Sequence, residues 1–324
     1  MAGVKQAGKK IAETALVTGG CGFIGSHLVE KLAEKGFKVK IIDSLIKGRL
    51  SSIQYLIDNG KAEFIEGDIR ERDAVDSAMK GCDYVFHTAG VHIQRSCASP
   101  EEAIDVNVRG SYNVFKSALD NNVKRVIFSS SSSVYGDPEK LPMSEESELK
   151  IVEPYGASKL MSEHLLRFLS KKGLNFNILR YFNVYGERQA AHAYYTTVII
   201  HFIKNLLKNQ PPVIDGRGDQ SMDFTHVSDV VNANLLAMQS AHCNDVFNVG
   251  TGTATSVKEL AEILAEAVGK NVKPIFKERE VLVTKRQADT RKAEKILGFR
   301  AKVNVRDGLF EVARAIAAHP ELYV

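Results

Sequence analysis

The sequence of 324 residues lacks the long apolar runs and the patterned cysteines that mark several classes of protein. No segment is apolar over the roughly 20 residues that a membrane-spanning helix needs, so we expect no membrane partner. The chain has four cysteines, and they show neither metal-ligand spacing nor a paired secretory pattern: Cys21, Cys82, Cys97 and Cys243. We therefore expect reduced, structural thiols and no metal site.

A strong excess of one charge is also missing. The 43 basic and 39 acidic residues give a net charge of +4, which is too small and too evenly spread to indicate a nucleic-acid partner. One local excess of basic residues, between Lys270 and Lys302, fits either a solvated face or a site for an anionic small molecule. The first residues contain no apolar signal-peptide core, so we expect a flexible tail over residues 1–13 and a cytoplasmic location.

What the sequence does contain is a regular alternation of apolar and amphipathic segments. Strand-like stretches cover residues 14–18, 37–43, 62–66, 83–87, 123–128 and 175–182, and helix-like stretches between them cover residues 23–35, 71–79, 101–119 and 155–170. This alternation predicts an α/β fold with a Rossmann-type, doubly wound parallel sheet over residues 14–181. After Arg180 the pattern becomes irregular, apart from a late strand near 245–250 that should complete the sheet. We expect residues 182–324 to form mainly a smaller, irregular C-terminal substrate-binding domain.

A glycine-rich segment, "TGGCGFIGSHL" (Thr18–Leu28), follows the first strand and opens the first helix. Gly19, Gly22 and Gly25 fit a GxxGxxG spacing, and Gly20 would serve as the first glycine of GxGxxG. Either spacing lets the backbone approach a pyrophosphate closely, and the helix N-terminus offers free N–H groups to it. The segment predicts a dinucleotide site, with a simple tight turn as the alternative.

Asp43 ends the second predicted strand, eighteen positions after Gly25. A carboxylate there accepts hydrogen bonds from the adenosine ribose and repels a 2′-phosphate, which favours NAD over NADP. Lys47 and Arg49 lie close in sequence, so NADP stays open as an alternative.

Five consecutive serines lie in "FSSSSSVYG" (Phe128–Gly136), directly after the strand predicted over 123–128. A serine run on its own is typical of a flexible linker. Ligands of open α/β sheets, however, bind at the carboxyl ends of strands. The run is therefore a candidate site, with an ordinary strand-to-loop turn as the alternative.

The segment "PYGASK" places Tyr155 and Lys159 four residues apart at a helix start, on one face of that helix. A lysine ammonium and a bound oxidised nicotinamide would lower the pKa of the Tyr155 phenol toward neutrality and make it a general base. The same spacing occurs at Tyr112 and Lys116, but that pair lies in the middle of a helix, where we expect an ordinary contact between helices.

Taken together, these segments resemble one family. "TGGCGFIG", "GDIR" (Gly67–Arg70), "SSSSSVYG", "YGASK", "RYFNVYG" (Arg180–Gly186) and "DFTHVSDVV" (Asp223–Val231) are similar in content and order to the extended short-chain dehydrogenase/reductases, specifically the nucleotide-sugar 4-epimerases. The resemblance implies an NAD-binding domain closed by a domain for a nucleoside-diphosphate sugar. It also implies a homodimer through helices near 101–119 and 155–170.

The resemblance assigns roles to individual residues. The implied catalytic residues are Ser131, Tyr155 and Lys159. The implied NAD contacts are Gly19, Gly22, Phe23, Ile24, Gly25, Asp43, Asp68, Ile69, Ala89, Asn107, Tyr155 and Lys159. The implied sugar-nucleotide contacts are Ser131, Ser132, Tyr155, Asn183, Val198, Ile199, Arg279 and Arg286.

The implied reaction inverts C4 of a UDP-hexose. Tyr155 removes the C4 hydroxyl proton, hydride passes to NAD, and the 4-keto sugar turns over before it takes the hydride back. Related dehydratases carry Asp and Glu where this chain has Ser132 and Ser133, so dehydration is not expected. A sugar ketoreductase or a non-catalytic NAD-binding regulator of the same fold remain alternatives.

Three departures from the family pattern concern the sugar nucleotide. Met222 replaces an expected phosphate-binding arginine, and Val281 and Leu282 replace a Gly-Asp pair that contacts the ribose. Arg286 stands three residues before Asp289, at a position that lines the hexose pocket in the family. We expect Arg286 either to reach the diphosphate in place of the missing arginine or to pair with a carboxylate on the sugar. Arg188 is a candidate second partner in the carboxylate case.

Overall fold

The fold is built on one seven-stranded sheet in the order β11-β6-β5-β4-β1-β2-β3, with every neighbouring pair parallel. The computed structural model describes residues 12–189, 197–278 and 285–320. The chain runs from β1 out to β3 and then returns to β4 on the other side of β1, so the strand order reverses there. This is a doubly wound α/β sheet, and the predicted fold class is confirmed. The strands are β1 (Thr14–Thr18), β2 (Lys38–Asp43), β3 (Ala62–Glu66), β4 (Tyr84–His87), β5 (Arg125–Ser131), β6 (Phe176–Tyr181) and β11 (Asp245–Val249).

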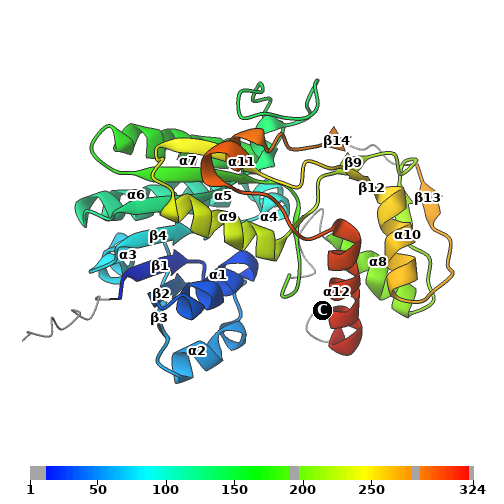
Figure 1. The fold of residues 1–324 in the computed structure, drawn as a ribbon, viewed down its shortest axis with the longest axis horizontal. Coiled ribbons are helices and arrows are strands. Elements are labelled where there is room, and N and C mark those ends of the chain that lie inside the picture. The colour runs from blue at the N-terminus through cyan, green and yellow to red at the C-terminus, as the bar shows by residue number, and fades with distance from the viewer. Residues whose placement is uncertain (1–11, 190–196, 279–284, 321–324) are drawn as a thin grey trace, which may run out of the picture.

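Helices cover both faces of this sheet (Figure 1). Helices α3, α6 and α7 pack together over one face, and α1, α9 and α11 pack over the other. Each face buries its own apolar cluster. The helices are α1 (Phe23–Glu34), α2 (Gln54–Asp58), α3 (Arg72–Met79), α4 (Ile93–Ala98), α5 (Pro100–Ala103), α6 (Ser111–Asp120), α7 (Pro154–Ser170), α9 (Val227–Gln239) and α11 (Arg291–Leu297), with the short helical turns η1 (Leu50–Ser52), η2 (Ile104–Gly110) and η3 (Ser132–Tyr135).

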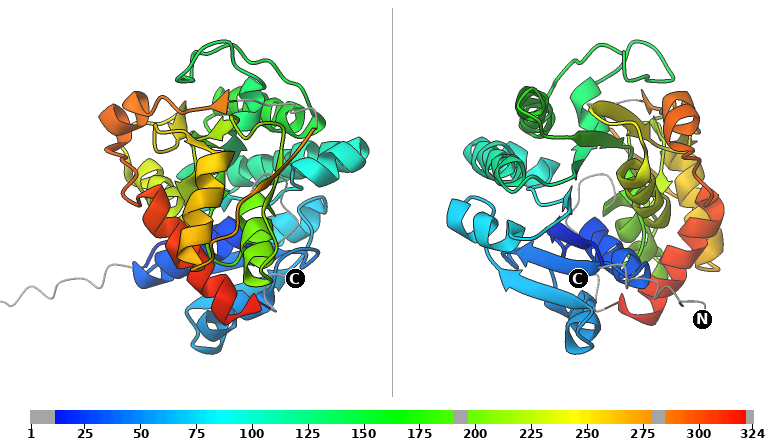
Figure 2. Two further views of the ribbon diagram at one scale, coloured as in Figure 1. Left: turned by 90° about the vertical axis from the view of Figure 1, so that its right-hand side faces the viewer. Right: turned by 60° about the vertical axis from the view of Figure 1, so that its left-hand side comes forward.

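A third apolar cluster lies outside the sheet, between helices α8, α10 and α12, which contact one another. Figures 1 and 2 show these helices as a separate group beside the sheet. The described residues of the same half of the chain also form three short sheets of two or three strands each. The elements are β7 (Val184–Tyr185), α8 (Thr197–Leu207), β8 (Val213–Asp215), β9 (Ser221–Met222), β10 (Thr225–His226), β12 (Thr255–Ser256), α10 (Val257–Ala267), β13 (Ile275–Lys277), β14 (Lys285–Arg286) and α12 (Val305–Ala318).

Two of the predicted elements differ from the observed ones. The helix predicted over 101–119 begins at Pro100 and contains a π-helical segment, Ile104–Gly110, before α6. The strand predicted over 123–128 continues through Ser131, because its ladder with β6 extends to the pair Ser131 and Tyr181. The prediction that the whole serine run follows the strand is therefore wrong for its first three members.

Within the described ranges, no helix is both long and apolar enough to cross a bilayer. The same residues contain no group of three histidine, cysteine, aspartate or glutamate side chains arranged to hold a metal ion. The four cysteines are all free thiols, and Cys21 and Cys82 are buried.

Candidate active site and cofactor pocket

The loop between β1 and α1 has room only for glycine at two positions. Gly19 adopts a φ of +70°, and a Cβ there would lie 2.8 Å from backbone atoms of Ala89. A Cβ on Gly25 would lie 2.1 Å from the carbonyl oxygen of Gly19. The loop is thus a bare backbone cradle at the start of α1, and its shape and free N–H groups fit the pyrophosphate of a dinucleotide.

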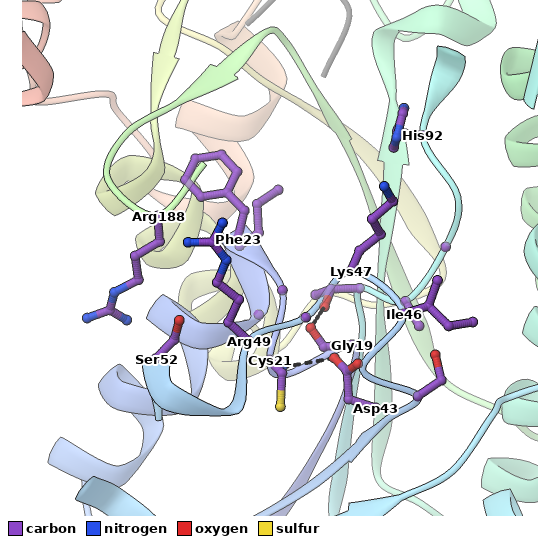
Figure 3. Close-up of a pocket in the computed structure, with 18 of the residues that line it drawn as sticks. Gly19, Cys21, Phe23, Asp43, Ile46, Lys47, Arg49, Ser52, His92 and Arg188 are labelled. Carbon is purple, nitrogen blue, oxygen red and sulfur yellow. Dashed lines mark hydrogen bonds between the residues drawn. The ribbon is translucent and has the colours of Figure 1, made fainter. Parts of the chain in front are cut away.

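This cradle opens into a cavity of about 940 Å³ (Figure 3). Nine of the predicted NAD contacts line it: Gly19, Gly22, Phe23, Ile24, Gly25, Asp43, Asp68, Ile69 and Ala89. The other three, Asn107, Tyr155 and Lys159, are not among the lining residues. The Asn107 side-chain oxygen accepts the Val91 N–H at 2.8 Å, and its nitrogen donates to Ser158 Oγ at 3.0 Å. Asn107 therefore holds the wall of the cavity in place in this structure.

Asp43 lies at the cavity edge with both carboxylate oxygens engaged by the backbone. One oxygen accepts the Cys21 N–H at 3.0 Å (Figure 3). The other accepts the Leu45 N–H at 2.8 Å. Burial raises the pKa of this carboxyl group, and the two hydrogen bonds oppose the rise. Lys47 and Arg49 also line the cavity, so both signs of charge lie near the predicted ribose position.

Every serine of the run has a polar partner. Along β5, Ser129 and Ser131 point to one side and Ser130 to the other, as a strand requires. The partners are Tyr181 for Ser129 (3.0 Å), Glu163 for Ser130 (2.6 Å), the Ser133 backbone N–H for Ser131 (3.1 Å), and the Arg286 guanidinium for Ser132 (3.2 Å) and Ser133 (3.4 Å). The run is a set of fixed hydroxyl groups and not a linker.

The three predicted catalytic residues meet at the end of β5. The Ser131 hydroxyl lies close enough to the Tyr155 phenol to lower its pKa, and Lys159 Nζ lies 5.8 Å from the centre of the Tyr155 ring. Lys159 is only 4% exposed and donates to the Ser129 carbonyl oxygen at 2.9 Å. Glu153 caps helix α7 by accepting the Tyr155 N–H at 2.6 Å, which fixes the helix start that carries the tyrosine.

Burial dominates the pKa values of the pair in the protein alone. Burial raises the pKa of Tyr155 to about 12, although the Ser131 hydroxyl beside it opposes the rise. Burial also lowers the pKa of Lys159 to about 8. The predicted lowering of the Tyr155 pKa refers to the protein with NAD bound, and it stays a prediction.

The structure adds a buried ion pair that the sequence did not indicate. Arg180 donates to both carboxylate oxygens of Glu163, at 3.0 and 2.7 Å, and both side chains are almost fully buried. The Tyr135 hydroxyl accepts from Arg180 at 2.9 Å, and Ser130 donates to Glu163. This pair anchors α7, β5 and β6 to one another beneath the catalytic residues.

Comparison with known proteins agrees with this geometry. Residues 15–250 match the model of the NAD dependent epimerase/dehydratase family. This chain belongs to that family. A putative UDP-glucose 4-epimerase of Methanocaldococcus jannaschii is 38% identical over 302 residues, which cover 92% of this chain and 96% of that protein.

Solved structures show the same relationship. The UDP-glucose 4-epimerase of Thermotoga maritima with UDP-glucose has a TM-score of 0.88 and 34% identity, covering 95% of this chain and 99% of its own. The UDP-N-acetylglucosamine 4-epimerase of Methanobrevibacter ruminantium with UDP-N-acetylmuramic acid has a TM-score of 0.90 and 32% identity, with the same coverage. The predicted resemblance to extended nucleotide-sugar epimerases is confirmed, and the cofactor of this family member is NAD.

Five of the predicted sugar-nucleotide contacts lie in the second half of the chain of this epimerase family member. Asn183, at a φ of +31°, donates its side-chain N–H to the Asp223 carbonyl oxygen at 3.1 Å. Val198 and Ile199 form the first turn of α8, where Ile199 is buried in the third apolar cluster. Arg279 lies outside the described residues, as do Val281 and Leu282.

The two remaining arginines lie in different places. Arg286 on β14 is the register partner of Met222 on β9, and its buried guanidinium turns toward Ser132 and Ser133. Arg188 instead pairs with Glu30 on α1, and its role as a second partner of a sugar carboxylate stays a prediction. That pairing joins positions 158 residues apart, and no sequence spacing indicates it.

Proposed function

We propose that this chain is an NAD-dependent 4-epimerase of a UDP-hexose that acts through a 4-keto intermediate. The observation that carries the proposal is the meeting of Ser131, Tyr155 and Lys159 at the carboxyl end of β5, in a family whose cofactor is NAD. The two epimerase structures, one with UDP-glucose and one with a UDP-amino sugar, support a UDP-sugar as substrate.

Each of these residues has one task in the proposed reaction. Tyr155 takes the proton of the C4 hydroxyl, and Ser131 hydrogen-bonds the same oxygen. When bound, NAD supplies the hydride acceptor and a positive ring charge near the phenol. Lys159, held by the Ser129 carbonyl, adds a second cation that favours the Tyr155 phenolate. Tyr155 returns the proton after the 4-keto sugar has turned over, so no net oxidation occurs.

The residues beside Ser131 argue against dehydration. Loss of water across C5 and C6 needs its own acid and base, whereas this chain has the hydroxyls of Ser132 and Ser133, which accept hydrogen bonds from Arg286. A complete catalytic trio also disfavours a purely regulatory NAD-binding protein. A sugar ketoreductase uses the same trio and is the second candidate.

Cofactor stoichiometry separates these two candidates. We would incubate the purified protein with UDP-glucose and UDP-galactose separately, without added cofactor, and follow the sugar signals by NMR. An epimerase brings both samples to the same mixture, and the Ser131→Ala variant should do so about 10²- to 10⁴-fold more slowly. Failure to interconvert the two sugars, together with oxidation of one added NADH per molecule of a UDP-4-keto-hexose in a separate incubation, would instead establish the ketoreductase.

Arg286 bears on the choice of sugar. Its contacts with Ser132 and Ser133 place the guanidinium next to the catalytic Ser131, which supports contact with the sugar over contact with the diphosphate. We therefore include a UDP-hexuronate among the proposed substrates. Under this proposal Arg286→Ala weakens turnover of the uronate alone. An equal loss for UDP-glucose and for binding of UDP itself would assign Arg286 to the diphosphate.

We also propose a homodimer formed through the helices η2, α6 and α7. Apolar side chains are exposed along these helices: Ile104, Tyr112, Met161 and Phe168. Covering such side chains with the same face of a second copy would remove them from water. Light scattering should show a dimer, and Met161→Glu combined with Phe168→Glu should give a monomer. A cytoplasmic location belongs to the same proposal and agrees with the four free thiols.

A further inference from the structure

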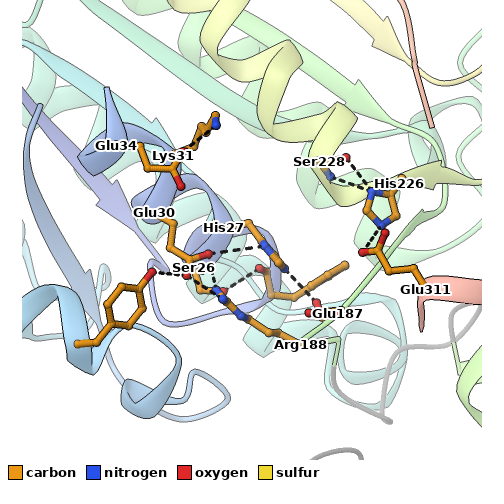
Figure 4. A network of polar contacts seen from close by, with 12 residues as sticks. Ser26, His27, Glu30, Lys31, Glu34, Glu187, Arg188, His226, Ser228 and Glu311 are labelled. Carbon is orange, nitrogen blue, oxygen red and sulfur yellow. Dashed lines mark hydrogen bonds and ion pairs between the residues drawn. The ribbon is translucent and has the colours of Figure 1, made fainter. Parts of the chain in front are cut away.

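Glu30, on the third turn of α1, is contacted by side chains from two distant segments (Figure 4). Arg188 donates to both of its carboxylate oxygens, each at 2.8 Å, and Tyr55 on α2 donates its hydroxyl to the same carboxylate. We call Glu30, Tyr55 and Arg188 the Glu30 junction. A guanidinium that binds a carboxylate with two parallel hydrogen bonds is among the strongest polar contacts in proteins.

The segment that carries Arg188 is attached to α1 at two successive residues. The carbonyl oxygen of Glu187 lies 3.1 Å from His27 Nε2, one turn before Glu30. Arg188 itself adopts a φ of +64°, a backbone conformation that is uncommon outside glycine. The surrounding contacts must hold this conformation, and it directs the guanidinium toward α1.

The junction lies at the edge of the cofactor cavity. Arg188 and Tyr55 both line that cavity, together with the first residues of α1, whereas Glu30 lies behind it and does not line it. Figure 3 shows Arg188 on the same side of the cavity as Phe23 and Ser52. The three members therefore connect the glycine-rich side of the cavity, the segment after Asp43 and the segment after β7.

We propose that the Glu30 junction retains NAD by holding these three wall segments together. A bound dinucleotide leaves only when segments of the wall separate, and Glu30 is the residue to which two of them are fixed. In this proposal Glu30 is a positioning residue: it acts on NAD release through Arg188 and Tyr55, and it takes no part in the chemical step. Hydrogen bonds from Arg188 and Tyr55 lower the pKa of Glu30 more than burial raises it, so the carboxylate is charged at neutral pH.

The decisive variant is Glu30→Gln, because it keeps the size of the side chain and removes the charge that binds Arg188. We expect NAD to dissociate from the holoenzyme about tenfold faster, because one part-exposed charged pair is lost. Release is measured as free NAD in a coupled dehydrogenase assay. With NAD in excess, the turnover number should stay within about twofold of the original, since a positioning role in retention does not alter the chemical step.

Glu34→Gln is the matched control, since Glu34 lies one turn along α1 and pairs with Lys31 on the exposed face. It should leave NAD release unchanged. The exchange Glu30→Arg with Arg188→Glu should restore slow release by rebuilding the pair in reverse. Release from Glu30→Gln at the original rate, or an equal acceleration in Glu34→Gln, would overturn the proposal. The measurements of NAD release do not depend on which sugar the enzyme accepts, so their outcome stands apart from the test of epimerisation.

Discussion

Replacement of Lys159 by methionine should make the NAD-free protein more stable while it removes activity. Lys159 is buried, and its pKa falls from 10.5 to about 8. A shift of one pKa unit corresponds to about 1.36 kcal/mol, so burial of the ammonium lowers the free energy of unfolding by about 3 kcal/mol at pH 7. Methionine also loses the hydrogen bond to the Ser129 carbonyl, which contributes about 1 kcal/mol. The net expectation is a gain of about 2 kcal/mol.

The lowered pKa of Lys159 also determines how the stability difference between the two proteins changes with pH. Below about pH 8 the lysine is charged in both states and the full penalty of burial applies. Between about pH 8 and about pH 10.4 the unfolded state binds more protons, so the original protein gains stability as the pH rises and Lys159→Met does not. At pH 9.5 the burial penalty should have fallen to about half its value at pH 7.

Urea unfolding of the NAD-free proteins at pH 7 and pH 9.5 measures both effects. Lys171→Met, at the exposed end of the same helix, is the control and should change stability by no more than about 0.5 kcal/mol. The reasoning fails if Lys159→Met is less stable than the original at pH 7. It also fails if the stability difference between the two proteins does not shrink at the higher pH.

Three further predictions follow from the site. Tyr155→Phe should lower turnover at least about 10²-fold with its NAD content intact, whereas Tyr112→Phe should keep most activity; equal losses would show that the catalytic assignment is wrong. Asp43→Asn should narrow the preference for NAD over NADP in titrations of both cofactors, and equal affinities in the original protein would remove its basis. Arg180→Met should lower the free energy of unfolding by about 3–5 kcal/mol because it strands the buried Glu163 charge, and adding Glu163→Leu should recover most of the loss; an unchanged thermal midpoint in the single variant would contradict this.

The parts of the site that the sequence predicted correctly are those set by local chain geometry. The glycine spacing after a strand determines a cradle because each Cβ would meet backbone atoms of the same loop or its neighbour. The spacing of Tyr155 and Lys159 determines their common face because both lie in the first turns of α7. The alternation of strands and helices likewise gave the fold class, since parallel strands require crossover helices.

Other parts depended on contacts between distant positions. The partners of Glu30 and Glu163 come from separate segments of the chain, and nothing in their own spacing reveals them. The extent of β5 was missed for the same reason, since three serines are poor candidates for a buried strand until their partners are known. The burial that raises the pKa of Tyr155 in the protein alone was not predicted, because sequence patterns show burial poorly for a tyrosine at a helix start.

The serine run explains how a polar segment can lie at the centre of a folded domain. Ser130 binds Glu163, which binds Arg180, whose other contact is Tyr135, and the Tyr135 hydroxyl donates to the Asn248 side chain on β11 at 2.7 Å. The chain of contacts thus ties β5 through β6 to the far edge strand, so each polar group beneath the site is satisfied by protein. Buried networks of this kind resist rearrangement because an unpaired member is costly. The end of β5 is held rigidly as a consequence, which keeps Ser131 beside the Tyr155 phenol as the proposed reaction requires.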